Sequence, residues 1–400
     1  MQTTSEMAST YFESRDYGQF IEQDFRHRWL RPSFLYDKLK KYEGHNLEIG
    51  EAGKSIEGRP IYKLKYGSGK TKVVLWTQMH GNEPTATMAL IDFLNFLTKS
   101  DTYDSLRKIL FDNLEITMIP MLNPDGAERF TRRNALDIDP NRDAASLAMP
   151  ELKILTDWVE ENKPEWAFNL HDQRNIFTVG TSDKSATISF LAASADLEKT
   201  MTPTREKSMN LISELATVVE AHLPGHVGKY SDEFYPRALG EYFHKSKIPC
   251  VLIESGAYAN DEFRDNARKM NFLCLVEGLA KIANNDIPAD AIEKYKAIPE
   301  NSMNMLDVII RDSTLNYKGQ SLKADIGLLY KELPNFETNQ LERKLYVQDI
   351  GDLQFHFAFK DLAGGHIDCS KSRPEFEKVA NFEIIKEDGS IIQLAKGEMS

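Results

Sequence analysis

The chain has 400 residues, of which 41% are hydrophobic and 28% are charged, so it is long enough to fold as a globular protein with a sizeable core. Its 61 acidic residues outnumber its 49 basic residues. The resulting net charge of −12 argues against nucleic acid or an anionic membrane as the main partner.

Membrane-spanning and secreted proteins carry sequence signals that are missing here. No stretch approaches the roughly 18 consecutive apolar residues of a membrane-spanning helix. Residues 1–20 lack the basic and apolar regions of a signal peptide. The three cysteines (Cys250, Cys274 and Cys369) form no C-x-x-C pair and are too few for a disulfide framework. We therefore expect a cytoplasmic protein.

The first part of the chain predicts helices followed by alternating strands and helices. Residues 17–43 carry two helical patterns separated by Arg31-Pro32, the first around Phe20 and Trp29. Residues 47–53 and 60–66 have the pattern of two short strands joined by a turn. The pattern then predicts a buried strand at 73–76, a helix at 84–97, a helix near 103–111 and a strand at 114–120.

The loop that follows the strand at 73–76 contains His80 and Glu83. Open α/β sheets bind their ligands at the carboxyl ends of strands, where such loops lie. An imidazole and a carboxylate three residues apart in a turning loop can reach the same metal ion. The pair alone is weak evidence, because a chain with nine histidines contains such a spacing by chance.

Residues 121–144 form a long polar stretch with no sustained period, and it contains the turn signal Asn-Pro-Asp-Gly at 123–126. Long irregular segments after a strand are usually functional or disordered, so a solvated surface loop is the alternative. Four arginines nevertheless gather here in a chain that is acidic overall. Guanidinium groups suit the binding of a carboxylate or an oxyanion.

Two further strands end in side chains that could take part in chemistry. A helix at about 147–162 precedes a short β-type run that ends in His171. Helical patterns fill 185–222 and 240–247, and the apolar strand 251–253 then ends in Glu254. A helix is predicted at 260–284.

The composition changes after about residue 286, where two prolines frame a polar helix and short strands follow. We therefore expect an α/β domain at 1–285 with a helical segment at 1–45, a linker at 286–304, and a small antiparallel, sandwich-like β domain at 305–400. The α/β domain is expected to have a mixed, mostly parallel sheet with helices on both faces.

Three apolar strands thus end in His80 with Glu83, in His171 and in Glu254. The carboxyl ends of parallel strands share one edge of a sheet, so these side chains should lie together. Two histidines and one glutamate form a tetrahedral zinc site with one open position, which is typical of catalysis. Mononuclear iron takes the same ligands and stays an alternative.

Glu254 is the candidate general base. A carboxylate that follows three apolar residues is partly desolvated, and desolvation raises its pKa toward the range useful for taking a proton from water. The alternative is a strand-end carboxylate that pairs with an arginine.

These residues resemble the zinc carboxypeptidase family, the carboxypeptidase A-like metallopeptidases, over roughly residues 30–285. The resemblance rests on ordered motifs whose sequence and spacing both match. They are H-G-N-E at 80–83, N-P-D-G at 123–126, Arg132 nine residues before Asn141-Arg142, N-L-H at 169–171 and I-E-S-G at 253–256.

The resemblance implies a role for each residue at a matching position. His80, Glu83 and His171 would bind one Zn²⁺, and Asp139 would orient the first histidine. Glu254 would be the general base, and Arg132 would stabilise the oxyanion. The remaining implied residues bind substrate: Asn141 and Arg142 the terminal carboxylate, and Tyr235 or Tyr230, with Tyr235 preferred, as the mobile tyrosine. The substrate would be a peptide or amino-acid conjugate with a free carboxylate.

The chain departs from the family at Asp143, where many members have an asparagine and then an aromatic residue. A second acidic group there could alter the preferred substrate. The β domain lies outside the resemblance.

Two other functions are weighed against a carboxypeptidase. A zinc-dependent deacylase of the aspartoacylase and succinylglutamate desuccinylase type has similar ligand motifs, but such enzymes are shorter and generally lack Asn-Pro-Asp-Gly. A non-catalytic binding module with a decayed site is disfavoured, because every expected ligand, the base and the arginine are present.

Overall fold

The computed structural model describes residues 11–25 and 27–400, and the chain divides into two compact units. The first unit runs to Gln173 and resumes over Ala186–Asn301, and the second consists of Arg174–Ser185 and Ser302–Ser400. Residues 1–10 lie outside the described residues. Part of the predicted N-terminal helical segment and part of the stretch examined for a signal peptide fall on them. The predicted boundaries, 1–285, 286–304 and 305–400, remain a prediction, and the two units are described separately.

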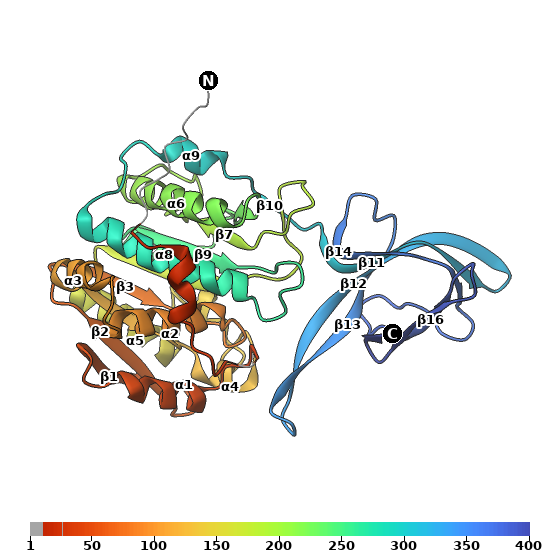
Figure 1. The fold of residues 1–400 in the computed structure, drawn as a ribbon, viewed down its shortest axis with the longest axis horizontal. Helices are drawn as coiled ribbons and strands as arrows, with labels where there is room; N and C mark the ends of the chain where they lie inside the picture. The colour runs from red at the N-terminus through yellow and green to blue at the C-terminus, as the bar shows by residue number, and fades with distance from the viewer. Residues whose placement is uncertain (1–10, 26) are drawn as a thin grey trace. The chain divides into compact units, whose positions relative to one another are not determined.

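The first unit is built on a mixed sheet of eight strands within the described residues (Figure 1). Their order is β1 (Leu47–Lys54), β2 (Pro60–Tyr66), β4 (Leu114–Ile119), β3 (Thr71–Trp76), β5 (Trp166–Asp172), β9 (Cys250–Ser255), β7 (Ile188–Leu191) and β8 (Val227–Lys229). Strands β4, β3, β5 and β9 are neighbours and run parallel. Their apolar sequences suit strands that are covered on both faces. The predicted fold class is confirmed.

Helices cover both faces of this sheet (Figure 1). Val73 and Leu75 share a core cluster with α2 (Thr85–Thr98), α3 (Asp104–Asn113), α6 (Pro203–His222) and α8 (Asp265–Asn284). Val74 and Trp76 point to the other face, where α5 (Pro150–Asn162) and α7 (Leu239–Lys245) pack. Alternate residues of one strand therefore fill two cores.

Shorter helical elements complete the first unit: α1 (Pro32–Leu39), α4 (Pro124–Arg129), α9 (Ile292–Ala297), and the 3₁₀ turns η1 (Ser14–Gln19), η2 (Lys40–Tyr42) and η3 (Pro140–Arg142). Among the helices that the structure describes, none combines the length and the apolar character needed to cross a membrane.

The helix predicted around Phe20 and Trp29 is wrong for the described residues of 20–30, which adopt turns and extended backbone, whereas residues 17–19 belong to the 3₁₀ turn η1. Two backbone groups in this segment bind side chains from α2. Asp92 accepts a hydrogen bond from the Glu22 amide (2.7 Å), and Asn95 donates one to the Phe20 carbonyl (2.9 Å). Phe20 and Trp29 are buried, so their apolar spacing reflects packing onto the domain.

The helical prediction for 185–222 is right for α6 but wrong for residues 188–191, which form β7. Strand β7 pairs antiparallel with β9, and its four residues are buried. A short apolar run does not distinguish a buried strand from a buried helix by its periodicity. The pairing with β9 decides the outcome here.

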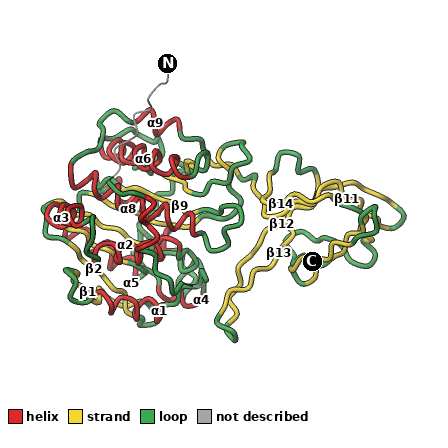
Figure 2. The backbone as a smooth tube through the Cα atoms, in the orientation of Figure 1, coloured by secondary structure: helices red, strands yellow, loops and turns green. Residues whose placement is uncertain are grey.

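The second unit is rich in strands (Figure 2). Its main sheet follows the order β13 (Gln340–Gly351), β12 (Gln320–Asn335), β11 (Met305–Tyr317), β15 (His366–Asp368), β16 (Phe382–Ile385), β17 (Ile391–Ala395) and β18 (Glu398–Met399), and β14 (Phe357–Ala363) pairs with β11. Strands β6 (Thr178–Val179) and β10 (Asn301–Ser302) form a small pair. The main sheet is mostly antiparallel, although β11 runs parallel to β14 and β15. The predicted strand-rich C-terminal region is confirmed.

Candidate functional site

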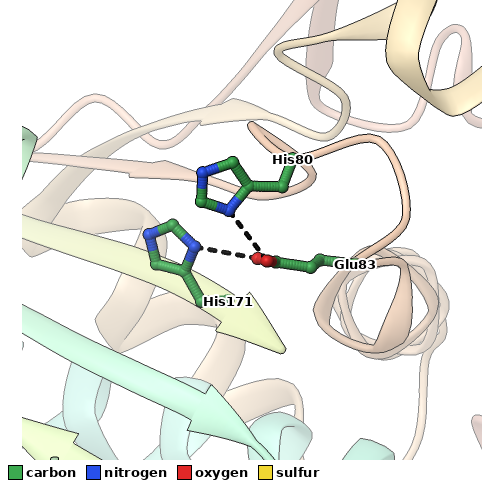
Figure 3. Close-up of side chains that lie close together, drawn as sticks. All are labelled: His80, Glu83 and His171. Carbon is green, nitrogen blue, oxygen red and sulfur yellow. Dashed lines mark hydrogen bonds and ion pairs between the residues drawn. The ribbon is translucent and has the colours of Figure 1, made fainter. Parts of the chain in front are cut away.

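His80, Glu83 and His171 converge at the carboxyl ends of β3 and β5 (Figure 3). The Nδ1 atoms of His80 and His171 lie 2.8 Å and 2.9 Å from the two carboxylate oxygens of Glu83. All three side chains are buried, and one ligand atom from each lies within 4.8 Å of the others. The cluster can therefore hold a metal ion.

A close backbone contact shapes the loop that carries His80 and Glu83. A Cβ atom added at Gly81 would lie 1.9 Å from the carbonyl carbon of Gly126, so only glycine fits at this point of the loop. The Gln78 side-chain amide donates to the Gly81 carbonyl (2.9 Å), and the Asn123 side chain accepts the Gly126 amide (2.9 Å). The H-G-N-E and N-P-D-G motifs thus press against each other. This contact is absent from the predictions above, although each motif carries its signal, a glycine.

Asp139 lies on the far side of the His80 ring. Its Oδ1 is 3.2 Å from His80 Nε2, and its Oδ2 accepts a hydrogen bond from Arg132 Nε (3.0 Å). Burial opposes its ionisation, but the imidazole and the guanidinium hold the pKa of Asp139 well below its usual range. A carboxylate at Nε2 leaves Nδ1 facing the cluster, as is typical of imidazoles that bind metal.

Arg132 also reaches the cluster itself. One terminal nitrogen of its guanidinium lies 3.1 Å from His80 Nδ1 and donates to Glu83 Oε1 (3.2 Å). Its side chain is 43% exposed, so the group stands at the border between the buried cluster and solvent. A cation there can act on a negative charge that forms above the cluster.

The electrostatics of the cluster favour a negative Glu83. Burial would raise the pKa of Glu83, but His80 and His171 beside it hold that pKa well below its usual value. Burial opposes a charged His80, yet Glu83 and Asp139 raise the pKa of this imidazole. Burial lowers the pKa of His171, which favours the neutral ring that a metal ligand requires.

Glu254 follows the apolar part of β9 and is the register partner of His171 on β5. Its side chain is buried, and its Oε2 has no hydrogen-bond partner. Burial, and then the nearby carboxylates of Glu83 and Asp172, raise the pKa of Glu254 well above its usual value. A carboxyl group of raised pKa with a free oxygen suits proton transfer near neutral pH.

The donor set fits a divalent metal ion, because two imidazole nitrogens and one carboxylate face a common point. Two histidines and one carboxylate leave a coordination position open in a tetrahedral site. The loop after β3 supplies His80 and Glu83, and the neighbouring parallel strand β5 supplies His171.

Asn141 and Arg142 of η3 each contact the segment 235–239 that leads into α7. The Asn141 side-chain oxygen accepts the Leu239 amide (2.9 Å), which ties η3 to the start of α7. The Arg142 guanidinium lies 4.2 Å from the centre of the Tyr235 ring. Tyr235 is 37% exposed and donates to Glu233 (2.7 Å). The contacts of Asn141 and Arg142 therefore hold η3 against residues 235–239.

The alternative tyrosine, Tyr230, packs against a small apolar cluster of Leu191, Ala193 and Leu252. Asp143, the residue at which the chain departs from the family pattern, is buried and accepts the Met149 amide (2.8 Å). This carboxylate therefore fixes the chain just before α5, which explains why an acidic residue is tolerated here.

Comparisons with known proteins find carboxypeptidases. Residues 34–147 match a family model described as zinc carboxypeptidase. Carboxypeptidase SOL1 of Arabidopsis thaliana is 27% identical over 195 residues, which are 45% of this chain and 37% of that protein. Carboxypeptidase 2 of Trichophyton rubrum is 31% identical over 141 residues, which are 32% of this chain and 25% of that protein. The chain thus spans well under half of the length of these relatives.

Solved structures share the fold of the first unit. A metallo-carboxypeptidase from Burkholderia cenocepacia aligns with a TM-score of 0.53 at 18% identity, over 63% of this chain and 69% of that one. Bovine thrombin-activatable fibrinolysis inhibitor, in complex with a tick carboxypeptidase inhibitor, aligns with a TM-score of 0.52 at 14% identity, over 64% of this chain and 98% of that one. The family-model match and the two similar carboxypeptidases confirm the predicted resemblance to the zinc carboxypeptidase family, and these structures show the shared fold.

Proposed function

We propose that the chain is a zinc-dependent metallocarboxypeptidase that releases the C-terminal residue of a peptide or amino-acid conjugate. The observation that carries this proposal is the convergence of His80, Glu83 and His171 with Glu254 as the register neighbour of His171. A metal-binding cluster beside a buried, proton-accepting carboxylate is the arrangement that amide hydrolysis by activated water requires. The family match over residues 34–147 supports the same reaction.

Each side chain has a distinct role in this proposal. His80, Glu83 and His171 would hold the zinc ion, and zinc held there supplies Lewis-acid activation of water and of the scissile carbonyl. Glu254 would accept a proton from the attacking water on its unpaired oxygen and then give that proton to the leaving amine nitrogen. Arg132 would donate hydrogen bonds to the oxygen of the scissile carbonyl as negative charge develops on it.

The terminal carboxylate of the substrate would bind Asn141 and Arg142. A guanidinium is suited to a carboxylate because both groups are planar and can form two parallel hydrogen bonds. Tyr235 lies against Arg142 and would close over the bound end of the substrate. Recognition of a free carboxylate restricts cleavage to the last bond of the chain.

A substrate panel tests the proposal. The purified full chain is incubated with peptides that end in a free carboxylate, with the same peptides as C-terminal amides, and with N-acyl amino acids. We expect release of the last amino acid from the free acids and at least a roughly 100-fold lower rate for the amides, because the amides lose the charge that Arg142 binds. Cleavage of N-acyl amino acids alone would support the deacylase and overturn the proposal.

Metal removal separates zinc from iron. Treatment with a chelator should abolish activity, and Zn²⁺ should restore it without a reductant. Recovery with Fe²⁺ and not with Zn²⁺ would contradict the zinc assignment.

A further inference from the structure

Next to His171, the side chain of Asp172 lies at the centre of a buried ionic cluster that the proposed reaction does not use. Its Oδ2 accepts hydrogen bonds from the Arg28 guanidinium (2.6 Å) and the Thr85 hydroxyl (2.7 Å). The Arg264 guanidinium lies 3.6 Å from the same oxygen. The side chains of Asp172, Arg28 and Arg264 are 3%, 5% and 8% exposed. We refer to Arg28, Thr85, Asp172 and Arg264 as the Asp172 cluster.

The members of the Asp172 cluster lie close in sequence to the predicted site residues. Asp172 follows His171, and its backbone amide donates to Glu83 Oε2 (3.2 Å). Thr85 begins α2 two residues after Glu83. The cluster therefore touches both elements that supply the proposed metal ligands.

The cluster also reaches the strand that carries the proposed base. The Arg264 guanidinium donates to the carbonyl oxygen of Ser255 (2.5 Å), the residue after Glu254. Arg264 thus links the end of β9 to the end of β5 through Asp172. A shift of Asp172 would move Glu83, His171 and Glu254 relative to one another.

Arg28 comes from the N-terminal segment, 144 residues before Asp172. A buried carboxylate that loses a cationic partner is less well compensated for its desolvation, so Asp172 without Arg28 would turn toward Arg264 or draw in water. Either change would disturb the amide that binds Glu83. Side chains that orient metal ligands affect metal affinity about 10- to 100-fold when they are lost.

We infer that the Asp172 cluster is a positioning device for the site, and that Arg28 makes the N-terminal segment part of this device. The inference rests on the proposed function, because it assigns the cluster to the placement of the zinc ligands and the base. Arg28 and Arg264 are positioning residues, since they act on the site through Asp172 and through the Ser255 carbonyl.

The first unit contains a matched control pair. Arg268 binds Asp92 through two hydrogen bonds of 2.7 Å and 2.6 Å, and both side chains are at most 5% exposed. Asp92 also accepts the Glu22 amide, so this pair fixes the same N-terminal segment to α2 and α8. Neither Asp92 nor Arg268 lies within two residues of a predicted site residue. The variant Arg268→Met therefore measures the structural effect of removing a buried arginine far from the predicted site.

The experiment compares Arg28→Met, Arg28→Lys and Arg268→Met in the full chain. Thermal unfolding, Zn²⁺ affinity in competition with a chromophoric chelator, and kcat and KM are measured at a temperature where every variant is folded. We expect Arg28→Met to weaken Zn²⁺ binding about 10- to 100-fold and to lower kcat about 10-fold, with KM changed less than about 3-fold. Arg28→Lys should recover part of both losses, because it restores the positive charge.

Arg268→Met should lower the unfolding temperature as much as Arg28→Met but keep Zn²⁺ affinity and kcat within about 3-fold of the wild-type values. Equal Zn²⁺ affinity and kcat in Arg28→Met and Arg268→Met would overturn the inference. If Arg28→Met does not fold, Thr85→Val removes one hydrogen bond to Asp172 with little change in volume. Thr85→Val should weaken Zn²⁺ binding several-fold, and an unchanged affinity would overturn the inference in the same way.

The outcomes separate this inference from the proposed function. Zinc binding without peptide cleavage by the wild-type protein contradicts the carboxypeptidase, while the affinity comparison still tests the cluster. Peptide cleavage with unchanged affinity in Arg28→Met supports the carboxypeptidase and overturns the cluster. Absence of zinc binding by the wild type overturns both.

Discussion

Two buried carboxylates of the first unit differ in how completely their oxygens are satisfied. Asp92 accepts four hydrogen bonds: one each from the Tyr17 hydroxyl and the Glu22 amide, and two from Arg268. Glu254 is also buried, but its Oε2 has no partner. A buried polar atom left unsatisfied costs free energy of folding, and the proposed proton transfer would give Glu254 Oε2 a use that offsets this cost. We therefore expect changes in the Asp92 region to affect stability and changes at Glu254 to affect the proposed reaction.

The largest expected effect comes from Glu254→Gln, which removes the proton acceptor but keeps the shape of the side chain. We expect kcat for a free-acid peptide to fall about 10³-fold, because general acid–base catalysis is lost. The unfolding temperature should not fall, because no hydrogen bond to Oε2 is broken and a buried carboxylate is removed. Stopped assays of amino acid release and thermal unfolding measure the two effects.

A matched control for Glu254→Gln is Glu277→Gln, which changes a buried glutamate that accepts the amides of Tyr11 and Phe12. This variant should lose stability and keep kcat. Retention of more than a tenth of the wild-type kcat by Glu254→Gln would contradict the role of this residue.

Asp92→Ala should have the opposite effect to Glu254→Gln, with a loss of stability and no change in kcat. It leaves the Arg268 guanidinium buried without its carboxylate, so the free energy of unfolding should fall by about 3–5 kcal/mol. Activity per folded molecule and Zn²⁺ affinity should stay unchanged. Denaturant unfolding measures the loss, and the double variant Asp92→Leu/Arg268→Met should recover most of it because no charge stays buried. A loss of kcat in the folded double variant would show that this region also serves the site.

His244 on α7 is a third buried group for this comparison. Its expected effect, a pH dependence of the free energy of unfolding, is the smallest of the three. Burial, and then Arg205, lower the pKa of His244 to about 4. Between about pH 6.5 and 4 the unfolded chain binds a proton at this residue that the folded chain does not bind. The free energy of unfolding therefore falls as the pH is lowered through this window, by about 2 kcal/mol between pH 7 and pH 5.

The His244→Gln variant should show a shallower loss of stability between pH 7 and pH 5 than the wild type, measured by denaturant unfolding at both pH values. His45→Gln, a change at an exposed histidine, should leave the slope as it is. An equal slope in His244→Gln and the wild type would mean that another group governs acid unfolding.

Sequence patterns predict the site well where a short motif carries the geometry. His80 and Glu83 share one loop, and His171 and Glu254 each follow an apolar run in adjacent parallel strands. Because the polar residue comes at the end of the run in each strand, the strand pairing brings the side chains to one edge. The roles of these residues, and of Arg132, Asn141, Arg142, Tyr235 and Asp139, stay predictions that the experiments above test.

Long-range contacts could not be predicted from a single sequence. In place of the helix expected around Phe20 and Trp29, the Glu22 amide and the Phe20 carbonyl bind the side chains of Asp92 and Asn95, about 70 residues later. The pairing of Arg28 with Asp172 spans 144 residues and follows no motif. Local propensity does not encode such partners, since they depend on how the finished elements pack.

The division of the chain has a consequence for how the second unit can form or be removed. This unit needs residues 174–185, which leave the first unit after β5, as well as the segment from Ser302 onward. The Ile176 carbonyl accepts the Met305 amide (3.0 Å), and Ile176 packs against Leu306 and Ile309. During synthesis, residues 174–185 therefore cannot pack until the last hundred or so residues have been made, because contacts of such long sequence separation form late. A truncation after Asn301 would leave Ile176 without the apolar residues it packs against, so a clean excision must also replace residues 174–185 with a short loop from Gln173 to Ala186.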